Sequence, residues 1–558
     1  MRPALLACCL ALTPVTVTAA QERQVFTRAD TLRGSNTPQR AWWDVTFYDL
    51  QATIIPSDSA VHGSNGITYR VLAPAQDMQI DLQAPLDIDS VVQDGQRLAF
   101  RRDGNAFFVT LGTPQRIGEQ RTLMVFYHGA YRAAGGTEAA AAGPFIWAVD
   151  SLGAPWVATT DEEIGASAWW PLKDDQADEP DSQRIAITVP DPMIDVSNGR
   201  LRSTTPNGDG TTTYEWFVTS PINGYDVAVN AAAHYAHFSG VYEGEGGALT
   251  LDFWPLSYHR DTATVQFQQA QSMLACFEHW FGPYPWYEDG YKLIETPYLG
   301  MEHQSGIAYG NRYLQGYRGK DLSGTGLGMQ WDFIIVHESA HEWWGNSLSG
   351  KDHAEMWLHE SFAMYSEGLY TECQQGKEAG ERYLVGLRGR VKNDVPILGH
   401  YGVHHTPKSQ DRYYKGSNML LTIRQVVDDD AKWRSILRGL NQTFRHQTVW
   451  GRQIEDYISD QAGVDLSKVF AQYLTTTWIP VLEYKVAGKT LSYRWSNVVP
   501  GFDMPLRVTL TDRQPYTLIH PTETWQTAKL HLKRPGDFHV DERFYVAAKN
   551  VADAASPP

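Results

Sequence analysis

The chain reads Val-His-Glu-Ser-Ala-His-Glu-Trp-Trp-Gly-Asn from Val336 to Asn346, and Glu-Met-Trp-Leu-His-Glu-Ser-Phe-Ala-Met-Tyr-Ser-Glu from Glu355 to Glu367. His337 and His341 stand four residues apart, so on a helix both imidazoles lie on one face and reach one ion. Glu338 is rotated by about 100° on the same helix and can face a water molecule at the ion without being a ligand. A catalytic zinc keeps three protein ligands, and Glu360, separated from His341 by eighteen residues, is the candidate for the third.

Two histidines on a solvated helix would be the simpler interpretation of this motif. The surroundings argue against it, because unpaired imidazoles and carboxylates are costly to bury. Apolar residues surround both halves of the motif: Ile334, Ile335, Val336 and Ala340, then Trp357, Leu358, Phe362 and Ala363. The stretch therefore predicts a buried metal site.

The length of the chain predicts several domains, and its net charge argues against a nucleic-acid-binding protein. A chain of 558 residues is too long for one core, and two to four domains are expected. The net charge of −17 argues against nucleic acid, because the phosphate backbone would be repelled. The same sign suits substrates with a free ammonium group, although a solvated acidic surface needs no such purpose.

Residues 1–20 are typical of a secretory signal. Arg2 supplies the charge, residues 3–12 the apolar run, and Ala19 and Ala20 a cleavage site before Gln21. The sequence around Cys8 also suggests a lipoprotein signal, which we rank second. No later stretch approaches eighteen uninterrupted apolar residues, so the mature chain is predicted to lack a membrane span and to be periplasmic or secreted.

After cleavage of the signal, Cys276 and Cys373 are the two remaining cysteines. One disulfide is compatible with this number, but a chain of this size does not require it. We expect two buried thiols.

The periodicity of apolar residues changes twice along the chain. Residues 21–255 alternate as strands do, with Asp94-Gly95 as one of the hairpin turns. Residues 256–480 have mostly helical spacing, and Gly282 with Pro283 ends one of the helices. Residues 481–558 return to strands and predict a small β-sandwich followed by a frayed tail from Ala552. The expected fold is a multidomain α+β chain with an N-terminal antiparallel β domain.

Three motifs together resemble the zinc aminopeptidases of the aminopeptidase N type, a family that includes the bifunctional leukotriene hydrolase. The first is the His-Glu-x-x-His helix with Glu360 in the Trp-Leu-His-Glu that follows it. The second is Leu299-Gly300-Met301-Glu302-His303, which is similar to the family's Gly-x-Met-Glu-Asn motif. The third is Tyr413-Tyr414-Lys415-Gly416. The resemblance implies a thermolysin-like catalytic domain and a short form without the helical fourth domain of longer members.

The resemblance also implies a role for each matched residue. His337, His341 and Glu360 would bind one Zn²⁺, Glu338 would be the general base, and Tyr413 would stabilise the oxyanion, with Tyr414 as the less favoured candidate. Glu367 lies seven residues after Glu360, at nearly the same helical angle, and would accept a hydrogen bond from a ligand imidazole or face solvent.

Substrate recognition is expected to depend on four further residues. A carboxylate of Glu302 beside the metal would pair with a free α-ammonium, and Gly300 and Met301 would bring backbone groups close to an extended peptide. Leu299 and His303 depart from the family's glycine and asparagine, which leaves Glu302 in place but alters its surroundings. Where the family has a glutamine near the substrate amine, this chain has acids, and Glu162 is the candidate.

The expected function is that of an exported zinc aminopeptidase acting on peptides with a free N-terminus. A thermolysin-like endopeptidase is the first alternative, although it gives no reason for Glu302. An epoxide hydrolase activity is a weaker alternative. A non-catalytic peptide- or glycan-binding protein on the same scaffold would be expected to lack a ligand, the base or the oxyanion donor, and none of these is missing. The oligomeric state and the preferred first residue are left open.

Overall fold

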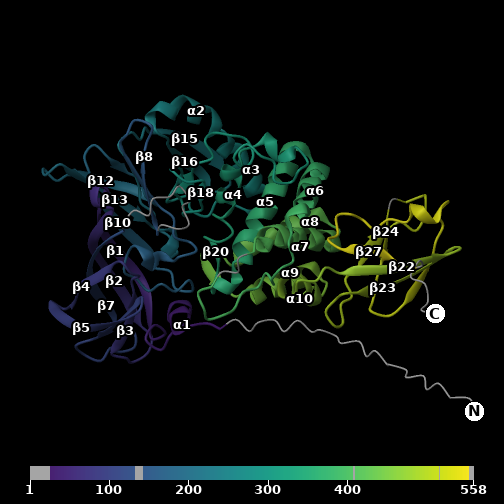
Figure 1. Cartoon of the computed structure of the whole chain (residues 1–558), viewed down its shortest axis with the longest axis horizontal. Coiled ribbons are helices and arrows are strands. Elements are labelled where there is room, and N and C mark those ends of the chain that lie inside the picture. Colours follow the sequence, from purple (N-terminus) through teal and green to yellow (C-terminus); the bar gives the residue numbers. More distant parts are fainter. Residues whose placement is uncertain (1–24, 132–142, 406–408, 515, 552–558) are drawn as a thin grey trace, which may run out of the picture.

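Three regions follow one another along the long axis of the molecule: a β region, a mainly helical region and a small β region (Figure 1). The computed structural model describes residues 25–131, 143–405, 409–514 and 516–551. The predicted signal and the tail from Ala552 lie outside these ranges. Among the described residues, no helix combines the length and apolarity needed to cross a membrane. The predicted α+β order is confirmed.

The first region is built on a ten-stranded sheet with the order β12-β13-β10-β1-β2-β7-β4-β5-β6-β3. Nearly all its pairs are antiparallel; β1 and β10 run parallel. The Asp94-Gly95 turn joins β4 to β5 with both residues at positive φ, as a tight hairpin requires. The region begins with the helix α1 (Arg28–Gly34), and its strands are β1 (Trp43–Ile55), β2 (Ala60–Val71), β3 (Asp77–Asp81), β4 (Asp87–Gln93), β5 (Gln96–Asp103), β6 (Ala106–Thr110), β7 (Gln120–Ala130), β10 (Ser182–Pro190), β12 (Arg200–Pro206) and β13 (Thr211–Val218).

A second, four-stranded sheet, β11-β14-β9-β8, lies in the same region. Its strands are β8 (Phe145–Val149), β9 (Pro155–Thr159), β11 (Ile194–Asp195) and β14 (Asn230–Ala232). The chain segment that follows β9 carries Glu162 toward the helical region. This segment is where the first region enters the candidate site.

A five-stranded sheet connects the first region to the helices. Its order is β15-β16-β17-β19-β18, so β18 is an edge strand. The strands are β15 (Phe238–Gly244), β16 (Gly247–Trp254), β17 (Tyr291–Glu295), β18 (Gly300–Met301) and β19 (Ile307–Tyr309). We placed β15 and β16 in an N-terminal domain ending at residue 255, but β16 pairs in parallel with β17 and both strands belong to the sheet of the helical region. Alternating apolar residues predict a strand but do not identify its partner.

The central region contains most of the helices and one short parallel strand pair. The helices are α2 (Arg260–Gln266), α3 (Gln269–Phe281), α4 (Phe333–Ala340), α5 (Trp357–Gln375), α6 (Lys377–Gly386), α7 (Asp411–Val427), α8 (Asp430–Thr443), α9 (Gly451–Ala462) and α10 (Ser467–Thr475); the strands are β20 (Leu348–Gly350) and β21 (Gln447–Val449). Gly282 ends α3 at φ 95°, as its sequence position predicted. Every side chain of α4 is buried, including the polar residues His337, Glu338 and Ser339 that follow its apolar first turn.

The last region is a small β unit packed on the helices. It consists of a four-stranded sheet, β26-β23-β22-β27, and a two-stranded sheet, β24-β25. The strands are β22 (Val481–Ala487), β23 (Thr490–Ser496), β24 (Leu506–Val508), β25 (Thr517–Ile519), β26 (Gln526–Lys529) and β27 (Ala547–Asn550). Trp495 and Leu506 belong to the same apolar cluster as Trp357 and Phe470 of the helices. The two regions therefore share one core.

Cys276 and Cys373 form a disulfide between α3 and α5. The expectation of two buried thiols was wrong. The sequence places the two cysteines 97 residues apart, and their proximity arises from the packing of two helices that no local pattern relates.

Candidate active site

Two helices bring the three proposed metal ligands together. The carboxylate of Asp332 caps the start of α4 by accepting from Ile334 N at 3.0 Å, which fixes the helix that carries His337. His341 is the C-cap residue of α4. Glu360 lies in the first turn of α5, which packs against α4.

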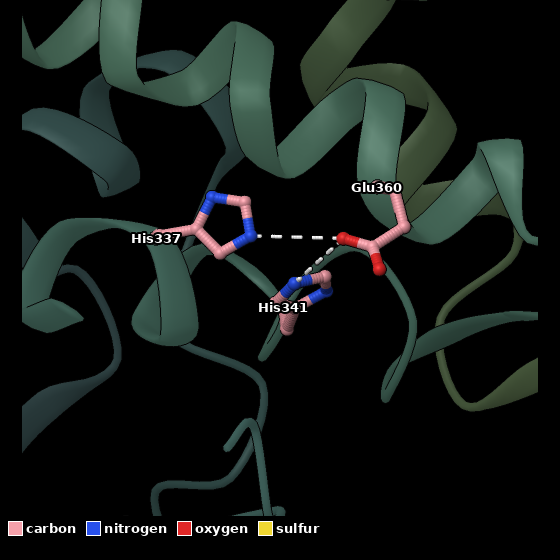
Figure 2. Close-up of side chains that lie close together, drawn as sticks. All are labelled: His337, His341 and Glu360. Atoms are coloured by element: carbon pink, nitrogen blue, oxygen red, sulfur yellow. Dashed lines mark ion pairs between the residues drawn. The ribbon is translucent and has the colours of Figure 1, made fainter. Parts of the chain in front are cut away.

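The imidazoles of His337 and His341 both face one oxygen of Glu360 (Figure 2). Glu360 Oε2 lies 3.6 Å from His337 Nε2 and 3.6 Å from His341 Nε2. It is buried and has no hydrogen-bond partner. Bonds of about 2.0–2.1 Å to a tetrahedral zinc would separate the ligand atoms by roughly 3.3 Å, so these residues fit such an ion.

The Nδ1 atom of each imidazole makes a hydrogen-bond contact with an oxygen of the protein. His337 Nδ1 lies 2.7 Å from Glu367 Oε1, and Glu367 in turn accepts from Tyr383 OH at 2.6 Å. His341 Nδ1 donates to Trp344 O at 3.0 Å. Because both contacts use Nδ1, the lone pair of Nε2 stays available, as a metal-binding imidazole requires. Of the two alternatives for Glu367, the structure therefore favours the contact with a ligand over exposure to solvent.

Glu338 lies beside the edge strand β18. A Cβ added at Gly300 would lie 3.0 Å from Glu338 Oε1 and 2.8 Å from Ile334 Cγ2, so a larger residue there would displace one of these side chains or the strand. Burial raises the pKa of Glu338 to about 7, and the nearby His337 acts in the opposite direction. Its carboxylate is free of the histidine contacts that occupy Glu360.

Glu302 follows β18 and is buried, with 4% of its surface exposed. One oxygen each of Glu302 and Glu338 and one nitrogen of His341 lie within 4.8 Å of one another. Asn346 Nδ2 donates to Glu302 O at 2.8 Å, which connects the Trp-Trp-Gly-Asn end of the first motif to the Glu302 backbone. Glu302 Oε1 has no hydrogen-bond partner, and burial followed by the neighbouring Glu162 raises the pKa of its carboxyl group.

The remaining candidates for substrate binding are Gly300, Met301 and Glu162. Gly300 and Met301 pair with Tyr309 and Ala308 of β19, which leaves the other edge of β18 unpaired within its sheet. Burial and the nearby carboxylate of Glu360 raise the pKa of Glu162 to about 8.

The phenol of Tyr413 donates to Glu360 Oε1, the oxygen opposite the one that faces the histidines. The ring of Tyr414 instead lies under the guanidinium of Arg390, 5.9 Å from its centroid. The geometry therefore favours Tyr413 over Tyr414.

Two residues of the site had no signal in the sequence. Arg412 is largely buried, pairs with Glu163 at 3.0 Å and lies 3.8 Å from Glu360 Oε1. Tyr225 comes from the first region, and its phenol is buried without a hydrogen-bond partner. Their distance along the chain from the motifs explains why spacing rules do not find them. His303 is also buried with neither ring nitrogen hydrogen-bonded, and burial lowers its pKa to about 3, so its imidazole is neutral.

This arrangement is the one that zinc-dependent hydrolases use. It consists of two histidines and one glutamate on adjacent buried helices, with a second glutamate beside them. Residues 265–473 match the peptidase family M1 domain. Through this central segment the chain is similar to peptidase family M1, the zinc metallopeptidases of the aminopeptidase N type.

Part of the chain is also similar to individual curated proteins. The chain is 27% identical over 170 residues to a probable aminopeptidase 1 of Sulfurisphaera tokodaii, covering 29% of this chain and 22% of that protein. It is 27% identical over 221 residues to aminopeptidase N of Lactobacillus helveticus, covering 36% and 26%. The matched segments thus span about a quarter of these curated relatives.

The fold is similar to that of a family M1 zinc metallopeptidase from Deinococcus radiodurans, solved as a mutant with a Tyr-Ser-Ala substrate. The TM-score is 0.65 at 20% identity, covering 78% of this chain and 95% of the other. At this identity the likeness shows the shared architecture.

Proposed function

We propose that this chain is a zinc-dependent aminopeptidase that removes the first residue of peptides. The observation that carries the proposal is the position of Glu302. Its carboxylate is buried, lacks a hydrogen-bond partner on Oε1 and lies in one cluster with Glu338 and His341. A buried, unpaired carboxylate beside a hydrolytic centre is suited to bind an α-ammonium group. Binding that group fixes the scissile bond at one residue from the N-terminus.

The metal would be held by His337, His341 and Glu360. Bound zinc polarises the scissile carbonyl and makes hydroxide available near neutral pH. The carboxylate of Glu338 accepts the proton of the attacking water and returns it to the leaving amine. The phenol of Tyr413 donates a hydrogen bond to the oxyanion that forms on the substrate carbonyl carbon.

The substrate backbone would lie along β18. An edge strand offers unpaired N–H and C=O groups, and an extended peptide can pair with them. Gly300 keeps this strand close to Glu338, so a paired peptide has its first carbonyl near the base. Glu302, two residues on, then meets the α-ammonium, and Glu162 would be a second acidic partner from the first region.

The names of the curated relatives and the peptide bound to the Deinococcus radiodurans enzyme support a peptide substrate. The test is a pair of peptides that differ only in an N-terminal acetyl group. An aminopeptidase releases the first amino acid from the free peptide and leaves the acetylated one intact. Internal cleavage of both peptides would instead indicate a thermolysin-like endopeptidase. Binding without cleavage of either would indicate a non-catalytic peptide-binding protein.

We also propose that the chain is exported by residues 1–20. The disulfide between Cys276 and Cys373 supports this, because such bonds persist in oxidising compartments. Mass spectrometry of the protein from its native cells tests the proposal. A mature chain that begins at Gln21 outside the cytoplasm is expected, and a cytoplasmic chain with Met1 retained would contradict it.

A further inference from the structure

Arg412 is the second residue of α7 and directly precedes Tyr413, the proposed oxyanion donor. Helix formation does not favour a cation at this place, because the positive end of the helix dipole lies at the first turn. The side chain is also largely buried, and burial of a guanidinium is costly unless its charge and its donors find partners. The position of Arg412 is therefore explained by the groups around its side chain rather than by the helix.

The first turn of α7 is fixed against α5, the helix that carries Glu360. Ser361 Oγ donates to Arg412 O at 2.6 Å. A Cβ added at Gly416, one turn further along α7, would lie 1.8 Å from the same Oγ, so the two helices approach as closely as glycine allows. The backbone of Arg412 thus has a fixed place beside the proposed metal ligand.

The guanidinium of Arg412 lies beside the phenol of Tyr413. Its Nη2 is 3.5 Å from Tyr413 OH, and its Cζ is 5.2 Å from the centroid of the ring. The imidazole of His337 lies 6.0 Å from the same ring, between centroids, and is inclined to it by 28°. The phenol oxygen therefore has a cationic donor beside it, while its own O–H donates to Glu360 Oε1.

A carboxylate of the first region holds the guanidinium in this orientation. Glu163, in the segment after β9, accepts from Arg412 Nη2 at 3.0 Å. The backbone carbonyl of Glu163 accepts from His404 Nε2 at 2.9 Å, which fixes the segment against the helical region. The Glu163 carboxylate is exposed, so the ion pair adds little stability and its effect is on the direction of the guanidinium.

Two groups of the site are close enough to depend on this guanidinium, the phenol of Tyr413 and the carboxylate of Glu360. Arg412 Nε lies 3.8 Å from Glu360 Oε1, beyond hydrogen-bond distance, and has no hydrogen-bond partner. Glu360 Oε1 is the oxygen that faces away from both imidazoles, and it already accepts from Tyr413 (Figure 2). The phenol is therefore the group on which Arg412 acts directly.

We propose that Arg412 is a positioning residue that makes the phenol of Tyr413 a stronger donor to the oxyanion. A hydrogen bond donated to the phenol oxygen polarises its O–H and strengthens the bond that this O–H donates in turn. The guanidinium stays protonated at any physiological pH, and its charge acts in the same direction. The inference rests on the proposed aminopeptidase function and adds a residue to it.

A double-mutant cycle on Arg412 and Tyr413 tests the inference. Arg412→Gln removes the charge, and we expect kcat on an unblocked peptide to fall about tenfold or more with KM within about threefold, the effect of one hydrogen bond to a charged group. In Tyr413→Phe, which lacks the phenol oxygen, the same substitution should cost at most about threefold. Arg382→Gln, at an exposed arginine of α6, is the control.

An equal loss in both backgrounds, or an unchanged kcat in Arg412→Gln, would overturn the inference and leave the aminopeptidase function standing. No release of amino acids by the unsubstituted protein would overturn both. Thermal unfolding of each variant shows whether it is folded at the assay temperature. If Arg412→Gln is not, Arg412→Lys takes its place with the same expected pattern, because lysine lacks the planar fork that reaches Glu163 and Tyr413 together.

The dissociation constant of zinc, measured by competition with a chelator, gives a readout independent of turnover. We expect Arg412→Gln to keep this constant within about threefold, since Arg412 makes no hydrogen bond to Glu360. A larger rise, such as the about 10–100-fold that loss of a partner of a metal ligand causes, would assign Arg412 to Glu360 and overturn the inference.

Discussion

Three buried glutamates lie within one small volume, and their neighbours separate their roles. Glu360 Oε2 faces two imidazole nitrogens at 3.6 Å and its other oxygen accepts from the Tyr413 phenol. Glu338 borders Gly300, whereas Glu302 Oε1 faces no donor in the protein. Although all three are glutamates, Glu360 is suited to bind a metal, Glu338 to contact a water molecule and Glu302 to bind an ammonium group.

Glu338→Gln should retain zinc and lose turnover. The amide has nearly the same shape but cannot accept the proton, so we expect kcat to fall by about 10²–10⁴-fold. Zinc content by atomic absorption should stay at one ion per chain. Glu378→Gln, an exposed residue of α6, is the control. Turnover within a factor of a few of the parent would remove Glu338 as the base.

Tyr413→Phe should lower kcat more than it changes KM, because its hydrogen bond to the oxyanion exists only in the transition state. Loss of such a donor costs about 10²–10³-fold in kcat. Tyr414→Phe is the matched control on the adjacent residue and should keep kcat within about threefold, since its ring lies under Arg390. A larger loss in Tyr414→Phe than in Tyr413→Phe would reverse the assignment.

At the scale of elements, the edge strand β18 and the helix α4 set the distance between substrate and base. β18 is two residues long, and its place at the sheet edge results from pairing with β19. The sequence identified the motif around Gly300 by resemblance but did not predict a strand there, since two residues carry no periodicity. The packing of α4 beneath it explains why glycine stands at position 300.

Gly300→Ala should impair catalysis without unfolding the chain. The added methyl group meets Glu338 Oε1 and the side chain of Ile334, so the strand or the base must move by several tenths of an ångström. We expect kcat/KM to fall about 10–100-fold, because displacement of catalytic groups by even 1 Å has effects of this size. Gly240→Ala in β15 is the control, since an added Cβ there meets nothing within 4 Å. Equal rates for both variants would show that β18 does not position the base.

The disulfide joins α3 to α5, the helix that carries Glu360 and Glu367. Replacing both cysteines by alanine should lower the free energy of unfolding by about 2–4 kcal/mol, because the unfolded chain regains the freedom of a long loop. Denaturant unfolding of the parent and the double variant measures the change. Addition of reductant should destabilise the parent and leave the variant unaffected, and identical midpoints would contradict the expectation.

At the scale of the whole molecule, the site is formed by two of the three regions. The helices supply the metal ligands, and the first region supplies Glu162 and Tyr225. The third region shares the helical core. A peptide bound at the centre would therefore contact both the helices and the first region.

Site residues that are close together in the sequence could be predicted from it, whereas residues far apart in the sequence could not. His337, Glu338 and His341 lie within little more than one helical turn, so their spacing predicts a shared site. Glu360 was proposed as the third ligand that a catalytic zinc needs, and Glu367 follows Glu360 at a helical interval. Tyr413, Glu302 and Glu162 depended on resemblance to a family. Arg412 and Tyr225 have no local pattern, because tertiary packing across long separations places them. For the same reason, the sequence did not predict the disulfide between Cys276 and Cys373 or the pairing of β16 with β17.

The central claim is that three side chains hold one zinc ion between α4 and α5. Anomalous diffraction at the zinc absorption edge from crystals of the zinc-loaded protein tests it most directly. We expect one strong peak about 2.0–2.2 Å from His337 Nε2, His341 Nε2 and Glu360 Oε2, and its loss in Glu360→Ala. A peak elsewhere, or none between these three atoms at saturating zinc, would contradict the account.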